Sequence, residues 1–148
     1  FKLSQLKWRK GQGNSGDLVY VTARDVMDRL DSVFGVEGWE TRFEYMGERV
    51  VCYLTCVING TKVTKADGSE DTKIEAAKGG LSKALVRASV HFGIGRYLYH
   101  PNAFDAQRKP ASWATPEGYD ALMAEREGQE IVQWRKEYSD GVQDRTRK

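Results

Sequence analysis

The segment 50–65, with Asn59-Gly60 near its centre, constrains the fold more than any other part of the chain. Side chains that favour strands dominate both flanks, and Asn-Gly between two such runs is the preferred sequence of a type I′ hairpin turn. In this register Val57 pairs with Lys62, and Cys56 pairs with Val63. Lys62 then projects from the face opposite the core. The sequence therefore predicts a long antiparallel hairpin.

The first strand of this hairpin alternates so that its apolar side chains share one face, which predicts a buried surface: Val50, Cys52, Leu54, Cys56 and Ile58. Cys52 and Cys56 would lie about 13 Å apart on one strand. That separation exceeds the ~7 Å limit for a disulfide. No histidine or cysteine pair completes a zinc motif. We therefore expect two buried free thiols.

Residues before the hairpin predict a short strand, a capped helix and another strand. Thr22 is expected to cap a helix, with Asp25 at its third position, and Gly35 to end it. The aspartates of this helix lie off its apolar face, which predicts solvated positions for Asp25, Asp28 and Asp31. Strands are expected at 18–21 and 39–45, and a polar loop at 66–71.

A second helix is predicted from about Lys73, with an apolar stripe at three-four spacing. Lys83, Arg87 and His91 occupy another face at i, i+4 spacing, and neither Lys83 nor Arg87 has an acidic residue one turn away.

Glycines mark both ends of this second helix. Gly79 and Gly80 indicate either a later helix start or a close approach to the backbone. Gly93 and Gly95 are expected to end the helix, with Tyr97 and Tyr99 in an extended run beyond.

Charge is segregated along the chain, although the net charge is only +2. Residues 1–16 carry +4, residues 17–48 carry −5 and residues 73–96 carry +4. This pattern suits either one anion-binding face or subunits whose acidic and basic flanks meet. Cations beside aromatic rings, as around Lys83 and Tyr97, are the components of a single-strand nucleic-acid site.

Other chemistries find little support in the sequence. A phosphate-binding GxxxxGK[ST] motif is missing, and no apolar run approaches the ~20 residues of a membrane span. His91 and His100 have no metal-ligand context, so we expect neither a metal nor a cofactor. Asp67, Glu70 and Asp71 could form a nuclease cluster, but a solvated loop is the preferred interpretation.

Four segments together resemble the Rad-fifty-two superfamily of single-strand DNA annealing proteins, especially its short phage and bacterial members. They occur in family order within residues 8–100: VYVTARDVMDRLDSVFGVEGW at 19–39, the hairpin at 50–65, KGGLSKALVRASVHFG at 78–93 and GIGRYLY at 93–99. The resemblance implies an α+β fold in which a long amphipathic helix packs across an antiparallel sheet. It also implies assembly into a ring with single-stranded DNA in an outer basic groove.

The resemblance implies that Arg87 lies on the helix lining this groove, with Lys10, Tyr20 and Lys78 at other groove positions. Family members usually have two adjacent cations on that helix, whereas this chain has Val86-Arg87, with Lys83 one turn earlier. Adding the cations of the hairpin and of the helix exit gives the full set of expected DNA-binding residues: Lys10, Tyr20, Lys62, Lys78, Lys83, Arg87 and Arg96.

The expected function is ATP-independent, non-enzymatic annealing of complementary DNA strands in recombination and repair. Alternatives are a single-strand or DNA-end protector without annealing activity, a metal-dependent nuclease, or a purely structural oligomer. Residues 1–104 are the expected DNA-binding and oligomerisation domain, and 105–148 a helical extension. We expect a ring of identical subunits, no membrane association and possible replication or recombination partner proteins. The expected location is the cytoplasm of a bacterium or phage-infected host, at the nucleoid.

Overall fold

The computed structural model describes residues 1–13, 16–70 and 76–129, without the side chains of 76–78. The chain divides into two compact units, Phe1–Asn102 and Ala103–Lys148. In the second unit, an isolated bridge joins Phe104 to Pro110, and residues 116–129 are helical. A helix is thus present within the helical extension predicted at 105–148, of which residues 130–148 lie outside the described part.

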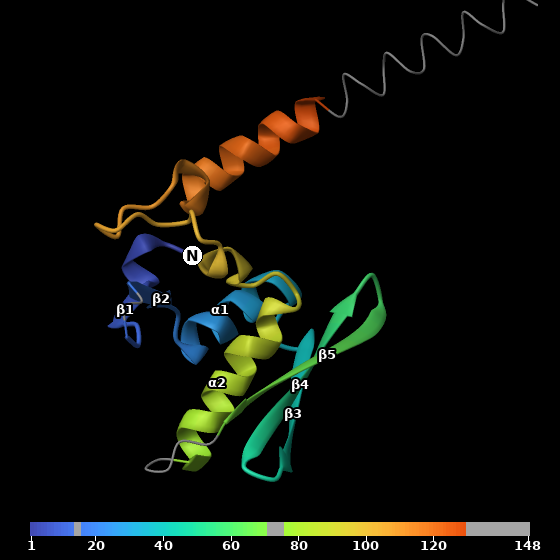
Figure 1. Cartoon of the computed structure of the whole chain (residues 1–148). Helices are drawn as coiled ribbons and strands as arrows, with labels where there is room; N and C mark the ends of the chain where they lie inside the picture. Colours follow the sequence, from blue (N-terminus) through green and yellow to red (C-terminus); the bar gives the residue numbers. More distant parts are fainter. Residues whose placement is uncertain (14–15, 71–75, 130–148) are drawn as a thin grey trace, which may run out of the picture. The chain divides into compact units, whose positions relative to one another are not determined.

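The described residues of the first unit form two antiparallel sheets and two α-helices (Figure 1). Its elements, in chain order, are the 3-10 turn η1 (Leu3–Gln5), β1 (Lys7–Lys10), β2 (Asp17–Tyr20), α1 (Ala23–Phe34), β3 (Trp39–Met46), β4 (Arg49–Ile58), β5 (Thr61–Glu70), α2 (Ala76–Val90) and the 3-10 turn η2 (Arg96–Tyr99). Strands β1 and β2 form one sheet, and β3, β4 and β5 form the other, with β4 at its centre. This matches the predicted α+β class, with the addition of β1.

The predicted hairpin is confirmed in its register and in its turn. Cys56 pairs with Val63 and Val57 with Lys62. Asn59 and Gly60 have φ angles of 50° and 77°, as a type I′ turn requires at both central positions. The predicted buried face is correct for four of its five members, all fully buried: Val50, Cys52, Leu54 and Cys56. Ile58 is 38% exposed because it lies beside the turn, beyond the cover of the helices.

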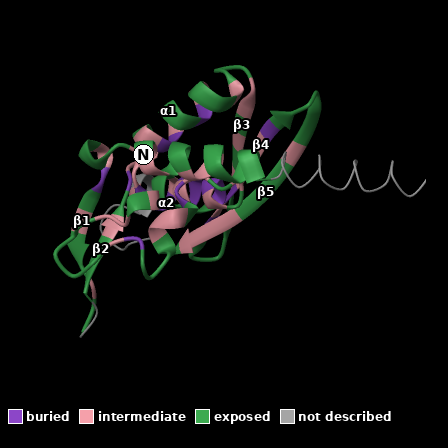
Figure 2. Ribbon diagram, turned by 90° about the horizontal axis from the view of Figure 1, so that it is seen from above, coloured by how far each residue is buried: buried purple, intermediate pink, exposed green. Residues whose placement is uncertain are grey.

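The core lies where both helices meet one face of β4 (Figure 2). The buried apolar side chains that the described residues of α1 and α2 contribute are Val26, Leu30, Ala84, Leu85 and Ala88. Both cysteines are free thiols, as predicted. Burial raises the pKa of Cys52 and of Cys56 to about 11.

Helix α1 begins and ends as predicted. The Thr22 hydroxyl accepts a hydrogen bond from the Asp25 backbone N–H and donates one to the Asp25 carboxylate. Gly35 follows the last turn with a φ of 80°. The solvated role predicted for Asp31 is wrong, because its carboxylate accepts a 2.7 Å hydrogen bond from the Trp39 indole.

The polar loop predicted at 66–71 is also wrong over its described residues, because β5 continues to Glu70. Every residue from Thr61 to Glu70 has a partner on β4. A Cβ added to Gly68 would lie 3.1 Å from the Val50 carbonyl oxygen, so glycine suits this close pairing. Asp71, the third candidate for a nuclease cluster, lies outside the described residues.

Alternate residues of β5 hold α2 along the sheet. Lys65 donates to the backbone carbonyl of His91, and Ser69 donates to the carbonyl of Gly80. Between them, Asp67 bonds the side chains of Arg87 and His91. The order of these contacts makes α2 antiparallel to β5. Since Gly80 is buried inside the helix, the glycine pair reflects a close approach and not a later helix start.

Beyond α2 the chain turns at glycines, as predicted, with positive φ angles at Gly93 and Gly95. The extended run expected at Tyr97 and Tyr99 is wrong, because both belong to the 3-10 turn η2. In a strand, residues two positions apart would share one face. In a 3-10 turn they point in different directions, so Tyr97 is half-buried whereas Tyr99 is 66% exposed.

Candidate functional site

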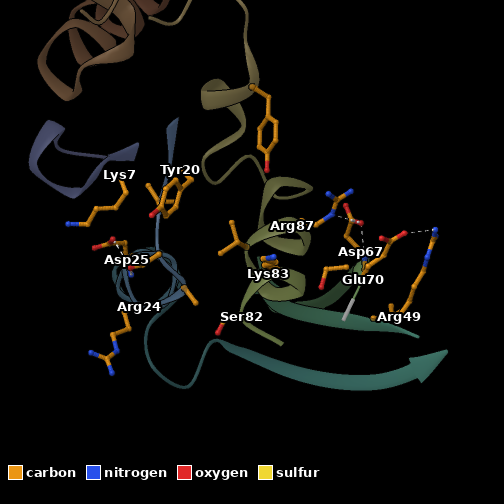
Figure 3. A pocket seen from close by; sticks show the side chains of 18 of the residues that line it. Lys7, Tyr20, Arg24, Asp25, Arg49, Asp67, Glu70, Ser82, Lys83 and Arg87 are labelled. Atoms are coloured by element: carbon orange, nitrogen blue, oxygen red, sulfur yellow. Dashed lines mark hydrogen bonds and ion pairs between the residues drawn. The ribbon is translucent and has the colours of Figure 1, made fainter. Parts of the chain in front are cut away.

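A broad groove of about 1740 Å³ lies between the β1–β2 hairpin, the start of α1, the exposed side of α2 and one end of the β3–β5 sheet (Figure 3). Among the described residues, six basic side chains line it: Lys7, Arg9, Arg24, Arg49, Lys83 and Arg87. Three described carboxylates also line it: Asp25, Asp67 and Glu70. The groove therefore carries an excess of positive charge, which suits an anionic ligand.

Four of these six cations form no ion pair with any carboxylate that the structure describes: Lys7, Arg9, Arg24 and Lys83. All four side chains are exposed. They come from β1, α1 and α2, so the unpaired charge spans the groove (Figure 3). Exposed, unpaired cations are available to phosphate groups without first breaking an internal contact.

The other two cations are paired with carboxylates of β5. The Arg87 Nε lies 3.4 Å from a carboxylate oxygen of Asp67, and Arg49 lies 3.3 Å from Glu70. Asp67 Oδ1 also accepts a hydrogen bond from the Gly68 backbone N–H. The other carboxylate oxygen, Oδ2, is hydrogen-bonded to His91 Nε2 at 2.9 Å. Although burial acts to raise the pKa of Asp67, these hydrogen bonds and the charge of Arg87 outweigh it and lower that pKa.

Asp25 occupies the opposite side of the groove. A hydrogen bond from the Thr22 hydroxyl is the main cause that lowers its pKa, against the effect of burial, and the charge of Lys7 adds to it. The carboxylate is thus held by the N-terminus of α1 and does not form an ion pair with Lys7.

Two exposed tyrosines, Tyr20 and Tyr99, also line the groove. Tyr20 is 42% exposed and pairs with Lys7 across the β1–β2 hairpin, so ring and ammonium share one face. Rings beside cations can contact bases while the cations contact phosphates, which is the requirement of a single-strand site.

The structure brings Tyr20, Lys83 and Arg87 together in this groove, and Val86 lies there between the two helical cations. Lys10 does not line it. In β1 successive side chains point to opposite faces, so Lys7 and Arg9 share the face of Tyr20 while Lys10 shares the face of Trp8.

Two further predicted residues, Lys62 and Arg96, also lie outside the groove lining. Lys62 is 3.4 Å from Glu40 on the opposite face of the sheet. Arg96 donates to the backbone carbonyls of Val90 and His91 at the end of α2, the position in which a cation satisfies free helical carbonyls. Lys78 lies in α2, but its side chain is outside the described residues.

Sequence reasoning missed Lys7, Arg9, Arg24 and Arg49 as groove residues. For β1 a signal was present, because alternation places Lys7 and Arg9 together on one face of a short strand. For Arg24 and Arg49 no signal was available, since only the packing of α1 and the sheet brings them to the groove.

Two comparisons with known proteins identify the family of this chain. Residues 1–114 match the family model described as "Rad52/22 family double-strand break repair protein". The chain belongs to the Rad52/22 family.

Two curated relatives carry the name "Single-stranded DNA-binding protein DdrA". The protein of Deinococcus radiodurans is 32% identical over 119 residues, 79% of this chain and 52% of the relative. That of Deinococcus deserti is 33% identical over 113 residues, 68% of this chain and 56% of the relative. The chain thus spans about half the length of these relatives. The family match contains the whole first unit and its groove.

Within residues 1–13, 16–70 and 76–129, no group of three or more His, Cys, Asp or Glu side chains is arranged to hold a metal ion. In the same ranges, no helix is both long enough and apolar enough to cross a lipid bilayer.

Proposed function

We propose that this protein binds single-stranded DNA in the groove and anneals complementary strands during DNA repair and recombination, without ATP and without chemical catalysis. One observation carries the proposal: cations of β1, α1 and α2 that form no ion pair with a described carboxylate line the same groove as two exposed tyrosines. Membership of the Rad52/22 family and the names of the two Deinococcus relatives support it.

Annealing of this kind requires two physical properties. Cations must reduce the repulsion between the strands' phosphates, and the bases must stay accessible to a second strand. An open groove with cations from several elements provides the first property. Exposed rings that contact some bases, without enclosing them, are compatible with the second. Base pairing itself supplies the sequence specificity, so no base-reading side chain is needed.

Titration of a fluorescent oligonucleotide at several salt concentrations tests the binding. Affinity should fall with salt by about 0.7 log unit per log salt for each phosphate neutralised. Lys83→Ala should weaken binding and reduce this slope by about the same amount, because Lys83 forms no internal ion pair with a described residue. An unchanged affinity and slope would place the DNA elsewhere on the molecule.

A single-strand protector without annealing activity is the second candidate, favoured by the names of the two relatives. Mixing two complementary labelled oligonucleotides separates the candidates. An annealing protein accelerates duplex formation above the rate in buffer, whereas a protector slows it. Addition of Mg²⁺ or Mn²⁺ to labelled DNA tests the nuclease alternative, for which we expect no cleavage.

We further propose that the protein acts as a ring of identical subunits on bacterial or phage DNA, at the nucleoid in the cytoplasm. Replication or recombination proteins are its proposed partners. Family membership and the bacterial origin of the two relatives support this. Electron microscopy with and without single-stranded DNA is the direct test, and a monodisperse monomer in both conditions would contradict the ring.

A further inference from the structure

The cations of the groove fall into two classes that the sequence does not distinguish. Lys83 and Arg87 lie one turn apart on α2, and both side chains are exposed. Lys83 has no ion-pair partner among the described residues, whereas Arg87 is paired with Asp67 of β5. The same strand supplies Glu70, the partner of Arg49. Strand β5 thus supplies the ion-pair partners of two of the six groove cations.

A phosphate that binds Arg87 meets Asp67 at the same guanidinium, where it either displaces the carboxylate from Nε or binds the terminal nitrogens beside it. Asp67 is well placed to compete, because its backbone is fixed by pairing with Cys52 and its side chain is only 28% exposed. The Gly68 N–H and His91 hold the carboxylate in position, so it does not have to be ordered when it contacts Arg87. Once displaced from Arg87, the carboxylate remains beside the phosphate as a like charge.

We propose that Asp67 and Glu70 are affinity-limiting residues: they occupy Arg87 and Arg49 until DNA displaces them, and they weaken the hold of the groove on single-stranded DNA. This inference rests on the proposed function of the groove. The gain for annealing is reversibility, since a strand held by every available cation would leave the groove too slowly to transfer into a duplex.

The test is a double-mutant cycle read by oligonucleotide affinity at low salt. Asp67→Asn should tighten binding about two- to fivefold, the range expected from the small free energy of an exposed ion pair. Arg87→Ala should then weaken binding more in the Asp67→Asn background than in the unmodified protein. Lys83→Ala should have the same effect in both backgrounds, because Lys83 is not paired with Asp67.

Asp28→Asn is the matched control, since it removes the same charge from an exposed position of α1 outside the groove lining. It should change affinity by less than about twofold. If Asp67→Asn and Asp28→Asn tighten binding equally, only net charge matters and the proposal fails. It also fails if Arg87→Ala has the same effect in both backgrounds.

Two measurements distinguish failure of this inference from misfolding of a variant and from failure of the proposed function. Thermal unfolding checks that Asp67→Asn folds. If it does not, Glu70→Gln, at the exposed end of β5, tests the same idea through Arg49, with about a twofold tightening expected. If the unmodified protein does not bind single-stranded DNA, the proposed function fails. If it binds but neither carboxylate variant binds more tightly, only this inference fails.

Discussion

The β4–β5 hairpin completely buries four side chains of one face, whereas the β1–β2 hairpin buries none of its strand residues. The two hairpins also differ in whether their charged side chains form ion pairs. Charged residues of β4 and β5 such as Arg49, Lys62 and Asp67 form ion pairs, while Lys7 and Arg9 of β1 form none with a described carboxylate. One hairpin therefore contributes to stability and the other contributes free charge to the groove.

This division has a physical basis. A strand that buries one face is fixed in register, and its charges can find constant partners across the sheet. A short hairpin with both faces accessible gains little from burial. Its cations remain free for a ligand. We therefore expect substitutions in β4 to change mainly stability and substitutions of the β1 cations to change mainly DNA binding.

Leu54→Ala, in the centre of β4, should lower the free energy of unfolding by about 2–5 kcal/mol, because it leaves a cavity at a fully buried position. Urea denaturation followed by circular dichroism measures this. Val57→Ala on the same strand is the control. Its side chain is 39% exposed, so the loss should stay below about 1 kcal/mol. Equal losses would mean that β4 does not form the core.

The buried thiols of β4 should make stability fall in alkali. Their pKa is raised from 9.0 to about 11, so thiols ionise more readily in the unfolded chain than in the folded one. The stability that the two protonated thiols contribute is therefore complete below pH 9 and is lost as the pH rises through 11. Each thiol should cost about 1 kcal/mol between pH 8 and pH 10. Cys52→Ala and Cys56→Ala should each remove one such loss, whereas an unchanged pH dependence would argue against buried thiols.

Lys7 and Arg9 should matter more for DNA binding than two cations that lie outside the groove lining. The double variant Lys7→Ala/Arg9→Ala should lose about tenfold in affinity at low salt, with a salt slope lower by about 1.4. The variant Lys10→Ala/Lys62→Ala removes the same charge and should lose less than about twofold. Equal losses would show that DNA also follows the faces that carry Lys10 and Lys62, as the resemblance alone predicts for Lys10.

Replacing a glycine by alanine should change stability differently at the two hairpins. Gly60→Ala should destabilise the protein by about 1 kcal/mol, because Gly60 has a φ of 77° in the type I′ turn. Gly16, before β2, has no such angle and nothing within 4 Å of an added Cβ. Gly16→Ala should therefore be neutral or slightly stabilising. Thermal unfolding of both variants tests the difference, and a costly Gly16→Ala would contradict it.

Much of the larger hairpin could be predicted from the sequence because its signals are local. An Asn-Gly pair sets the turn, and a period of two then fixes which residues share a face. The cap of α1 at Thr22 is equally local. The polar end of β5 could not be predicted, since residues 66–70 have no apolar alternation. They form a strand because β4 offers partners and α2 accepts bonds from Lys65 and Ser69.

The sequence by itself determined the α+β class, the register of the β4–β5 hairpin, the buried thiols and the cationic side of α2, since each depends on residues close together in the chain. Only the tertiary structure decided which cations share a groove and which are paired. Arg87 and Asp67 are twenty positions apart, and they meet because α2 runs back along β5. Strand parity then assigns Lys7 to the groove and Lys10 to the other face, because neighbouring side chains of a strand point in opposite directions.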